Sequence, residues 1–127
     1  MAKTVLIVED SPVQALSLLK LLESQGLSVI CAPNGVAGFE LALQQLPDVI
    51  VLDIHMPEMD GIETCRRLKQ ENATINIPVV LLTAHTEIEA FRGGIEGGAI
   101  DFIPKDAFSD AVLLATLNQL SILPSDA

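Results

Sequence analysis

The chain has 127 residues, half of them apolar, which suits one compact domain with a single core. Against 7 Lys plus Arg it has 17 Asp plus Glu, and the formal net charge of −10 argues against a nucleic-acid partner and favours a cation site or a basic protein partner. The two isolated cysteines lack zinc-site spacing, and no apolar run has the length of a membrane span or of a signal peptide's hydrophobic region, so we expect a cytoplasmic protein in a reducing compartment.

Five segments have the character of β-strands. Three apolar runs rich in β-branched residues, 5–8, 49–52 and 79–82, show no alternation of polar and apolar residues. This is typical of strands buried on both faces of a parallel sheet. Weaker runs at 27–31 and 99–103 complete the set.

Helical periodicity fills the segments between these strands. The predicted apolar faces are Val13, Leu16, Leu19 and Leu22 in the first helix, Val36, Phe39, Ala42 and Leu46 in the second, and Ile62, Cys65 and Leu68 in the third. Three pairs resemble a helix cap and its partner three residues later: Ser11 with Gln14, Asp60 with Glu63, and Thr86 with Glu89. Pro12, directly after Ser11, also suits the first position of a helix.

Strict alternation of strand and helix predicts an α/β fold, a doubly wound five-stranded parallel sheet with helices on both faces. The strand order 2-1-3-4-5 of flavodoxin-like proteins fits five such units. We expect one domain over residues 1–123, followed by a short tail at 124–127.

Three carboxylates are predicted at one rim of this sheet. Glu9 and Asp10 follow the first strand and Asp53 ends the third, and these strands are neighbours in the expected order. Clustered carboxylates repel one another, and a hard divalent cation such as Mg²⁺ removes that repulsion. The alternative is that these acids are simply solvated loop residues.

A hydroxyl and an ammonium group are predicted at the same rim. Thr83 ends the fourth strand and Lys105 follows the fifth, and either side chain can contact a phosphoryl oxygen. Taken singly, each is more often an ordinary turn or surface residue. Their significance comes from their common location.

The pattern as a whole resembles the receiver domain of bacterial response regulators. The resemblance rests on Val8-Glu9-Asp10-Ser11, on the run from Asp53 to Gly61 that begins Asp53-Ile54-His55-Met56-Pro57, on Thr83-Ala84, and on Phe102-Ile103-Pro104-Lys105. These motifs occur in family order at the ends of successive predicted strands and span nearly the whole chain.

The resemblance implies a role for each of these residues. Asp53 would accept a phosphoryl group from a histidine kinase or phosphotransfer protein. Mg²⁺ would be held by Glu9, Asp10, Asp53 and the backbone carbonyl of His55, and Lys105 would pair with the phosphoryl group. The domain would thus be no enzyme in the usual sense, although it would assist its own phosphorylation and the hydrolysis of the aspartyl phosphate.

The resemblance also implies a conformational switch. Thr83 would move toward the phosphoryl oxygen and Phe102 would follow. This would reshape the face that controls a downstream protein, which is formed by the fourth predicted helix (begun by the cap pair Thr86 and Glu89), the fifth strand at 99–103 and the C-terminal helix. Residues 111–125 carry no charge and are widely apolar, which indicates either a broad core contact or a partner surface, including a possible homodimer.

Two histidines flank the expected phosphoryl site. His55 lies two residues after Asp53 and His85 two residues after Thr83, positions from which they would tune the lifetime of the phosphorylated state. Dephosphorylation should then depend on pH between about 5.5 and 7.5, where histidine normally titrates. The alternative is that both rings point to solvent.

Two other functional classes agree less well with the sequence. An aspartate-nucleophile phosphatase would need a second Asp two residues after the nucleophile, where His55 stands. A degenerate receiver serving only as a docking module would lack site residues that this chain has. No glycine-rich nucleotide motif follows any predicted strand.

The sequence departs from the family pattern directly after Lys105. Asp106 follows Lys105 where the family usually has proline, and Pro104 precedes it. A cis bond before a residue other than proline costs roughly 2.5–4 kcal/mol, so we expect the Lys105–Asp106 bond to be trans.

Overall fold

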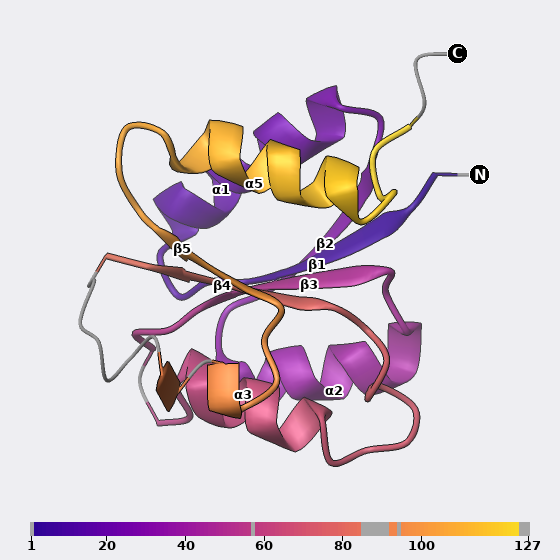
Figure 1. Ribbon diagram of the computed structural model, residues 1–127, viewed down its shortest axis with the longest axis vertical. Helices are drawn as coiled ribbons and strands as arrows, with labels where there is room; N and C mark the ends of the chain where they lie inside the picture. The colour runs from indigo at the N-terminus through magenta and orange to yellow at the C-terminus, as the bar shows by residue number, and fades with distance from the viewer. Residues whose placement is uncertain (1, 57, 85–91, 94, 125–127) are drawn as a thin grey trace.

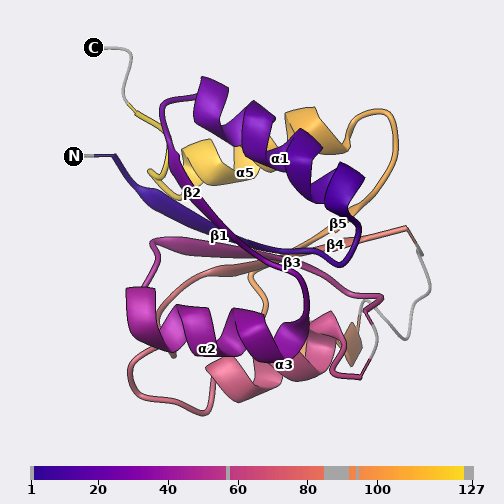
Figure 2. The same cartoon turned by 180° about the vertical axis from the view of Figure 1, so that it is seen from behind.

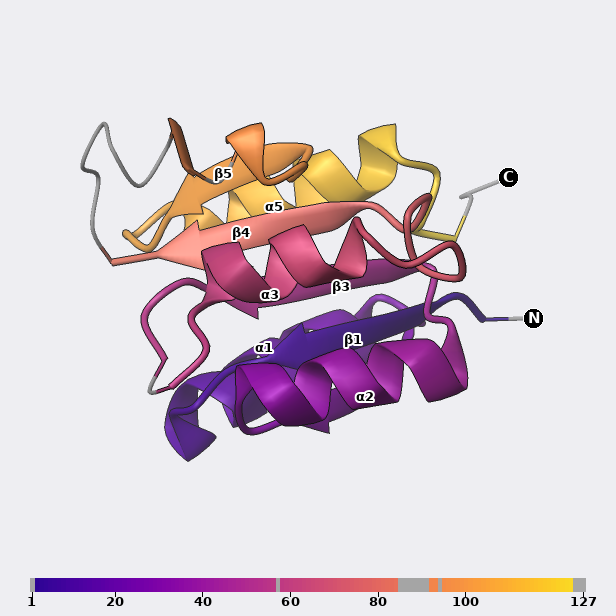
Figure 3. The same cartoon turned by 90° about the horizontal axis from the view of Figure 1, so that it is seen from below.

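A five-stranded parallel sheet forms the centre of the molecule. The computed structural model describes residues 2–56, 58–84, 92–93 and 95–124. The strands are β1 (Thr4–Val8), β2 (Ser28–Ala32), β3 (Val49–Asp53), β4 (Val79–Thr83) and β5 (Asp101–Pro104). Their spatial order is β2-β1-β3-β4-β5, as predicted, and Figure 3 shows β1, β3, β4 and β5 side by side. The two weaker strands lie one to two residues later in the chain than expected.

Helices cover both faces of the sheet. α1 (Pro12–Ser24) and α5 (Ser109–Gln119) lie on one face, and α2 (Gly35–Gln45) and α3 (Gly61–Leu68) lie on the other (Figures 1 and 2). The predicted α/β class and doubly wound arrangement are therefore confirmed. Within the part of the chain that the structure describes, no helix has both the length and the hydropathy to cross a bilayer.

The strands lack alternation because each of their faces contributes to a separate core. Leu6, Val8, Ile50, Leu52 and Leu81 belong to the core under α2 and α3, which also holds Cys65 and Leu68. Val5, Ile7, Val49, Val51 and Val80 belong to the core under α1 and α5, together with Leu22, Leu113 and Leu117. The side chains in both sets are buried. In the sheet, Val5 pairs with Val49 and Val8 with Leu52, so β1 and β3 end at the same level.

Two of the predicted apolar helix faces were partly wrong. Val13 is 78% exposed and Leu16 is 51% exposed, whereas Leu22 is fully buried. In α2, Ala42 is buried but Val36 is 46% exposed, and Leu46 lies at the C-cap with a left-handed backbone (φ 47°). A helix turns about 100° per residue, so residues spaced strictly by three drift by roughly 60° at each step and leave the buried face within three steps.

Helix starts follow the predicted caps only in part. Ser11 Oγ accepts a hydrogen bond from Gln14 N and Asp60 Oδ1 accepts one from Glu63 N, as expected for N-caps. The side chains of Gln14 and Glu63 do not bond back to the backbone N–H groups of these cap residues. Gln14 contacts Lys105, and Glu63 forms ion pairs with Arg66 and Arg67.

The segment between β4 and β5 is described only in part. Residues 92–93 and 95–96 are helical, and Gly97 and Gly98 form a turn in which Gly98 has φ +101°. The predicted cap pair, Thr86 with Glu89, lies outside the described residues.

Most of the apolar C-terminal segment packs inward. Leu113, Leu117 and Ile122 are buried, and Leu114, Leu120 and Leu123 pack partly against the same core. Val112, at 44% exposed, is the exception within the apolar set predicted there. This favours the broad core contact, while a homodimer surface stays a prediction. The described peptide bonds include no cis bond, so the Lys105–Asp106 bond is trans as expected.

Candidate functional site

Three carboxylates meet at the carboxyl ends of β1 and β3. Glu9, Asp10 and Asp53 each offer an oxygen, and these three oxygens lie within 4.8 Å of one another. Glu9 is 4% exposed and Asp53 is 6% exposed, while Asp10 is open to solvent. The strand order makes β1 and β3 neighbours, and this brings together residues more than 40 positions apart.

Backbone hydrogen bonds hold these strand ends in place. Glu9 N donates to Ala32 O at 3.1 Å, Ile54 N donates to Leu82 O at 3.0 Å, and Gly61 N donates to Ile54 O at 2.9 Å. The last bond folds the loop after β3 back beneath Asp53. The carboxylate of Asp53 therefore stands on backbone held by hydrogen bonds, as a site of defined geometry requires.

Lys105 connects β5 to the carboxylates. Its backbone N donates to Thr83 O at 2.6 Å, which places the side chain beside the end of β4. Its Nζ lies 3.2 Å from Asp53 Oδ1, 2.9 Å from Glu9 Oε2 and 2.5 Å from Gln14 Oε1. The predicted grouping of Lys105 with the acids is thus present in the structure. Its contact with Gln14 was missed.

The electrostatics of the site centre on Glu9. Burial raises the pKa of the Glu9 carboxyl above its usual value, and the nearby charge of Asp53 acts in the same direction. Hydrogen bonds from Lys105 Nζ and from Ser11 N lower the pKa of Glu9 and oppose that rise only in part. Three carboxylates cluster there with the one ammonium group of Lys105, so a further cation would relieve their mutual repulsion.

The donor set suits a small, hard divalent cation. All three side chains offer carboxylate oxygens, the ligand type that Mg²⁺ prefers. With ligands at about 2.1 Å, opposite oxygens around Mg²⁺ are roughly 4.2 Å apart, so the observed spread needs only small side-chain adjustment. Exposed Asp10 leaves one side open to water ligands, which Mg²⁺ usually retains.

The remaining predicted residues lie around this centre. Thr83 is fully buried at the end of β4, and Phe102 is half-buried in β5, where it packs against the core under α2 and α3. The side chain of His55 is exposed in the loop after β3, whereas His85 lies outside the described residues. The structure thus leaves lifetime tuning by the two histidines a prediction.

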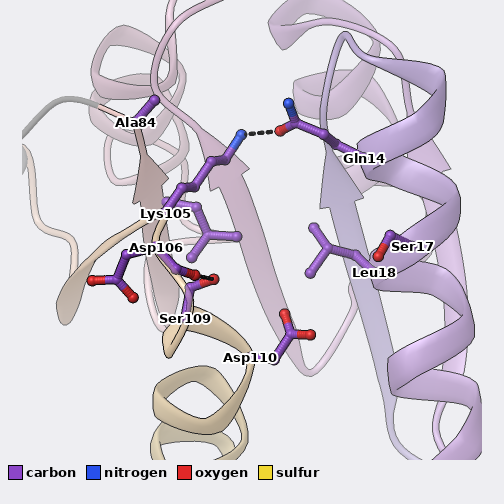
Figure 4. A pocket seen from close by; sticks show the side chains of 9 residues that line it. Gln14, Ser17, Leu18, Ala84, Lys105, Asp106, Ser109 and Asp110 are labelled. Atoms are coloured by element: carbon purple, nitrogen blue, oxygen red, sulfur yellow. Dashed lines mark hydrogen bonds between the residues drawn. The ribbon is translucent and has the colours of Figure 1, made fainter.

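An open groove adjoins the site between α1 and α5. It has a volume of about 380 Å³, and Figure 4 shows Lys105 and Gln14 at one end. Leu18 and Leu82 supply apolar lining, and Asp106, Ser109 and Asp110 line the side toward α5.

Comparison with known proteins agrees with this fold and this arrangement of residues. Residues 5–118 match the family model described as the response regulator receiver domain. The chain is 37% identical over 114 residues to protein PilH of Pseudomonas aeruginosa, covering 90% of this chain and 93% of PilH. It is 35% identical to response regulator MprA of a Mycobacterium species, covering 91% of this chain but only 49% of MprA.

A solved structure extends the comparison to the fold. The receiver domain of sensor histidine kinase PA1611 from Pseudomonas aeruginosa, solved with a magnesium ion in its active site cleft, superimposes with a TM-score of 0.86 at 26% identity, covering 94% of this chain and 98% of that one. Receiver domains are regulatory phosphoacceptor domains of two-component systems rather than classical enzymes. The matched residues, the sheet order and the acidic cluster agree, and the chain belongs to the response regulator receiver domain family.

Proposed function

We propose that Asp53 is the phosphoacceptor of this receiver domain and that Lys105 and a bound Mg²⁺ assist the transfer. The observation that carries the proposal is the contact of 3.2 Å between Lys105 Nζ and Asp53 Oδ1 inside the cluster of three carboxylates. The domain is taken as residues 1–123, with 124–127 as a tail.

Each residue of the site has a distinct task in the proposed chemistry. Glu9, Asp10, Asp53 and the carbonyl of His55 would hold Mg²⁺, which supplies positive charge for the equatorial phosphoryl oxygens. Lys105 adds a second positive charge beside Asp53. Thr83, at the adjacent strand end, donates its hydroxyl to a phosphoryl oxygen.

The transfer itself needs no oxidant or reductant. An oxygen of Asp53 attacks the phosphorus of a phosphohistidine or an acyl phosphate, forming a P–O bond as the bond to the leaving group breaks. Water later hydrolyses the aspartyl phosphate and restores the carboxylate. The histidines His55 and His85 tune the rate of this second step.

The phosphoryl group is then read by a partner protein. Thr83 and Phe102 couple the site to the face formed by the helical segment between β4 and β5, by β5 and by α5. This face binds a downstream target or a second copy of the chain. With a net charge of −10, the domain itself does not bind nucleic acid, because the phosphate backbone would repel it. The donor is a histidine kinase or phosphotransfer protein in the cytoplasm.

Intact-mass measurement after exposure to acetyl phosphate and Mg²⁺ tests the proposal. The wild-type chain should gain one phosphoryl group and Asp53→Asn should gain none. Asp110→Asn makes the same chemical change at an exposed position in the neighbouring groove, and it should behave as wild type. An equal gain in wild type and Asp53→Asn would place the acceptor elsewhere, and no gain in either would favour a docking module.

A further inference from the structure

Gln14 is exposed on the surface of α1, and yet its side chain forms a hydrogen bond with Lys105 of the site. It lies in the first turn of α1, and its Oε1 accepts a hydrogen bond from Lys105 Nζ at 2.5 Å, although the two residues are 91 positions apart. In Figure 4 both side chains reach across the end of the groove to meet. A surface glutamine of this kind is more often free in solvent.

The backbone of Gln14 is itself tied to the acidic cluster. Ser11 N donates to Glu9 Oε1 at 3.2 Å, and Gln14 N donates to Ser11 Oγ at 3.3 Å. The second oxygen of Glu9 accepts from Lys105 Nζ at 2.9 Å. Glu9, Ser11, Gln14 and Lys105 thus close a ring of hydrogen bonds, and this ring specifies where the glutamine amide stands.

Gln14 differs in charge from the other described partners of the Lys105 ammonium group. An ammonium group has three hydrogens to donate, and three oxygens lie within 3.2 Å of Nζ. Two of them belong to the carboxylates of Glu9 and Asp53, which the proposed function assigns to Mg²⁺. The amide oxygen of Gln14 is neutral, so it restrains the ammonium without adding negative charge to an already crowded cluster.

We infer that Gln14 is a positioning residue that holds the Lys105 ammonium group beside Asp53 for phosphoryl transfer. This inference rests on the proposed function of Asp53. It assigns Gln14 no contact with the phosphoryl group, and its effect passes through Lys105. A glutamine that merely meets a lysine at the surface would leave both the order of Lys105 and the transfer rate unchanged.

The first experiment reads the position of Lys105 without phosphate or Mg²⁺. Spectra of ¹⁵N-lysine ammonium groups report how fast their hydrogens exchange with water, and the chain has four lysines, with the Lys105 signal assigned from Lys105→Arg. In Gln14→Met, exchange at Lys105 should be at least about fivefold faster, because one hydrogen bond to a charged group is lost. Gln14→Glu keeps an acceptor and adds a negative charge, so exchange at Lys105 should stay at least as slow as in wild type.

Lys69 supplies an internal reference in the same spectra. Its Nζ donates to the carbonyls of Ile75 and Ile77 on the other face of the sheet, far from the contacts of Gln14. Its signal should be the same in wild type and Gln14→Met. A change at Lys69 as well would indicate general loosening and would count against the inference.

The second experiment measures phosphorylation of Asp53 by acetyl phosphate. Gln14→Met should lower the maximal rate about tenfold with little change in the acetyl phosphate concentration that gives half that rate, because the residue orders Lys105 rather than binding the donor. Ser17→Ala, one turn along α1 and also lining the groove, should match wild type. In a Lys105→Ala background, Gln14→Met should have no further effect.

The outcomes separate this inference from the proposed function. If wild type gains phosphate and Gln14→Met gains it equally fast, the positioning role is overturned while the proposed function stands. The same holds if Gln14→Met slows phosphorylation by the same factor in a Lys105→Ala chain as in the wild-type chain. Unchanged Lys105 exchange in Gln14→Met overturns it too. A wild-type chain that gains no phosphate overturns the proposed function, and the positioning role for phosphoryl transfer with it.

Discussion

The α-carbon of Gly61 lies directly against the backbone of Asp53. A Cβ added at Gly61 would overlap the carbonyl oxygen of Asp53 and would come within 2.9 Å of its carbonyl carbon. Gly61 begins α3, and its N–H bonds to Ile54 O, so neither backbone can withdraw without breaking a hydrogen bond. The start of α3 and the end of β3 therefore support the candidate acceptor as one unit.

Gly61→Ala should disturb the site through this contact. We expect a loss of about 1–3 kcal/mol in the free energy of unfolding, the usual cost of overpacking, together with slower phosphorylation of Asp53. Denaturant unfolding and intact mass measure the two effects. Gly93→Ala is the matched control, because its Cβ would contact only the side chain of Ile62, at 3.3 Å or more, and no backbone atom. Equal stability of Gly61→Ala and wild type would contradict the prediction.

Glu9→Gln should stabilise the fold while removing a proposed Mg²⁺ ligand. Burial and Asp53 raise the pKa of Glu9, so the folded chain binds its proton more tightly than the unfolded chain. The cost of the buried charge is absent below the unfolded pKa and grows as pH rises through the folded pKa. At pH 7 the variant should be more stable, by on the order of 1 kcal/mol, without Mg²⁺.

Two measurements check the sign of this effect. Unfolding free energies of wild type and Glu9→Gln should converge as the pH falls below about 4.3, the ordinary pKa of glutamate, where the carboxyl becomes protonated in both folded and unfolded chains. Addition of Mg²⁺ should stabilise wild type more than the variant. An advantage of Glu9→Gln that grew toward acid pH would show that the charge of Glu9 is not the cause.

The two cysteines should differ in reactivity. Cys65 is fully buried, its Sγ donates to Gly97 O at 3.5 Å, and burial raises its pKa to about 11. Cys31 is exposed in β2, although partial burial of the thiol and the charge of Glu23 raise its pKa. At pH 8 a thiol reagent should therefore label one cysteine in the native chain and two after unfolding. Fast labelling of native Cys31→Ser would contradict this assignment.

Lys69 should contribute to stability by anchoring the loop between α3 and β4. Its Nζ donates to the carbonyls of Ile75 at 3.0 Å and Ile77 at 2.5 Å. Lys69→Met keeps much of the apolar stem but leaves both carbonyls without this donor, and it should cost about 1–3 kcal/mol in thermal or denaturant unfolding. Lys20→Met, on the exposed face of α1, should stay within about 0.5 kcal/mol of wild type. Similar losses of stability in Lys69→Met and Lys20→Met would mean that the contacts of Lys69 with the loop are not the cause.

The sequence by itself determined the order of strands and helices and the acids at the strand ends. Both depend on local properties: unbroken apolar runs such as Val49–Leu52, turn and cap residues such as Ser11 and Asp60, and polar residues placed where a run stops. Once the strands are parallel, their carboxyl ends share one rim, so the meeting of Glu9, Asp10 and Asp53 follows from topology.

Only the tertiary structure decided which side chains meet across elements. Sequence spacing pairs Gln14 with its own cap Ser11, yet the amide contacts Lys105, because α1 and the end of β5 are brought to the same groove. Val13 and Leu16 look like core residues in the sequence but are exposed, since the rotation of α1 on the sheet sets which face is buried. Such contacts depend on the relative placement of elements that are distant along the chain, and no local pattern specifies that placement.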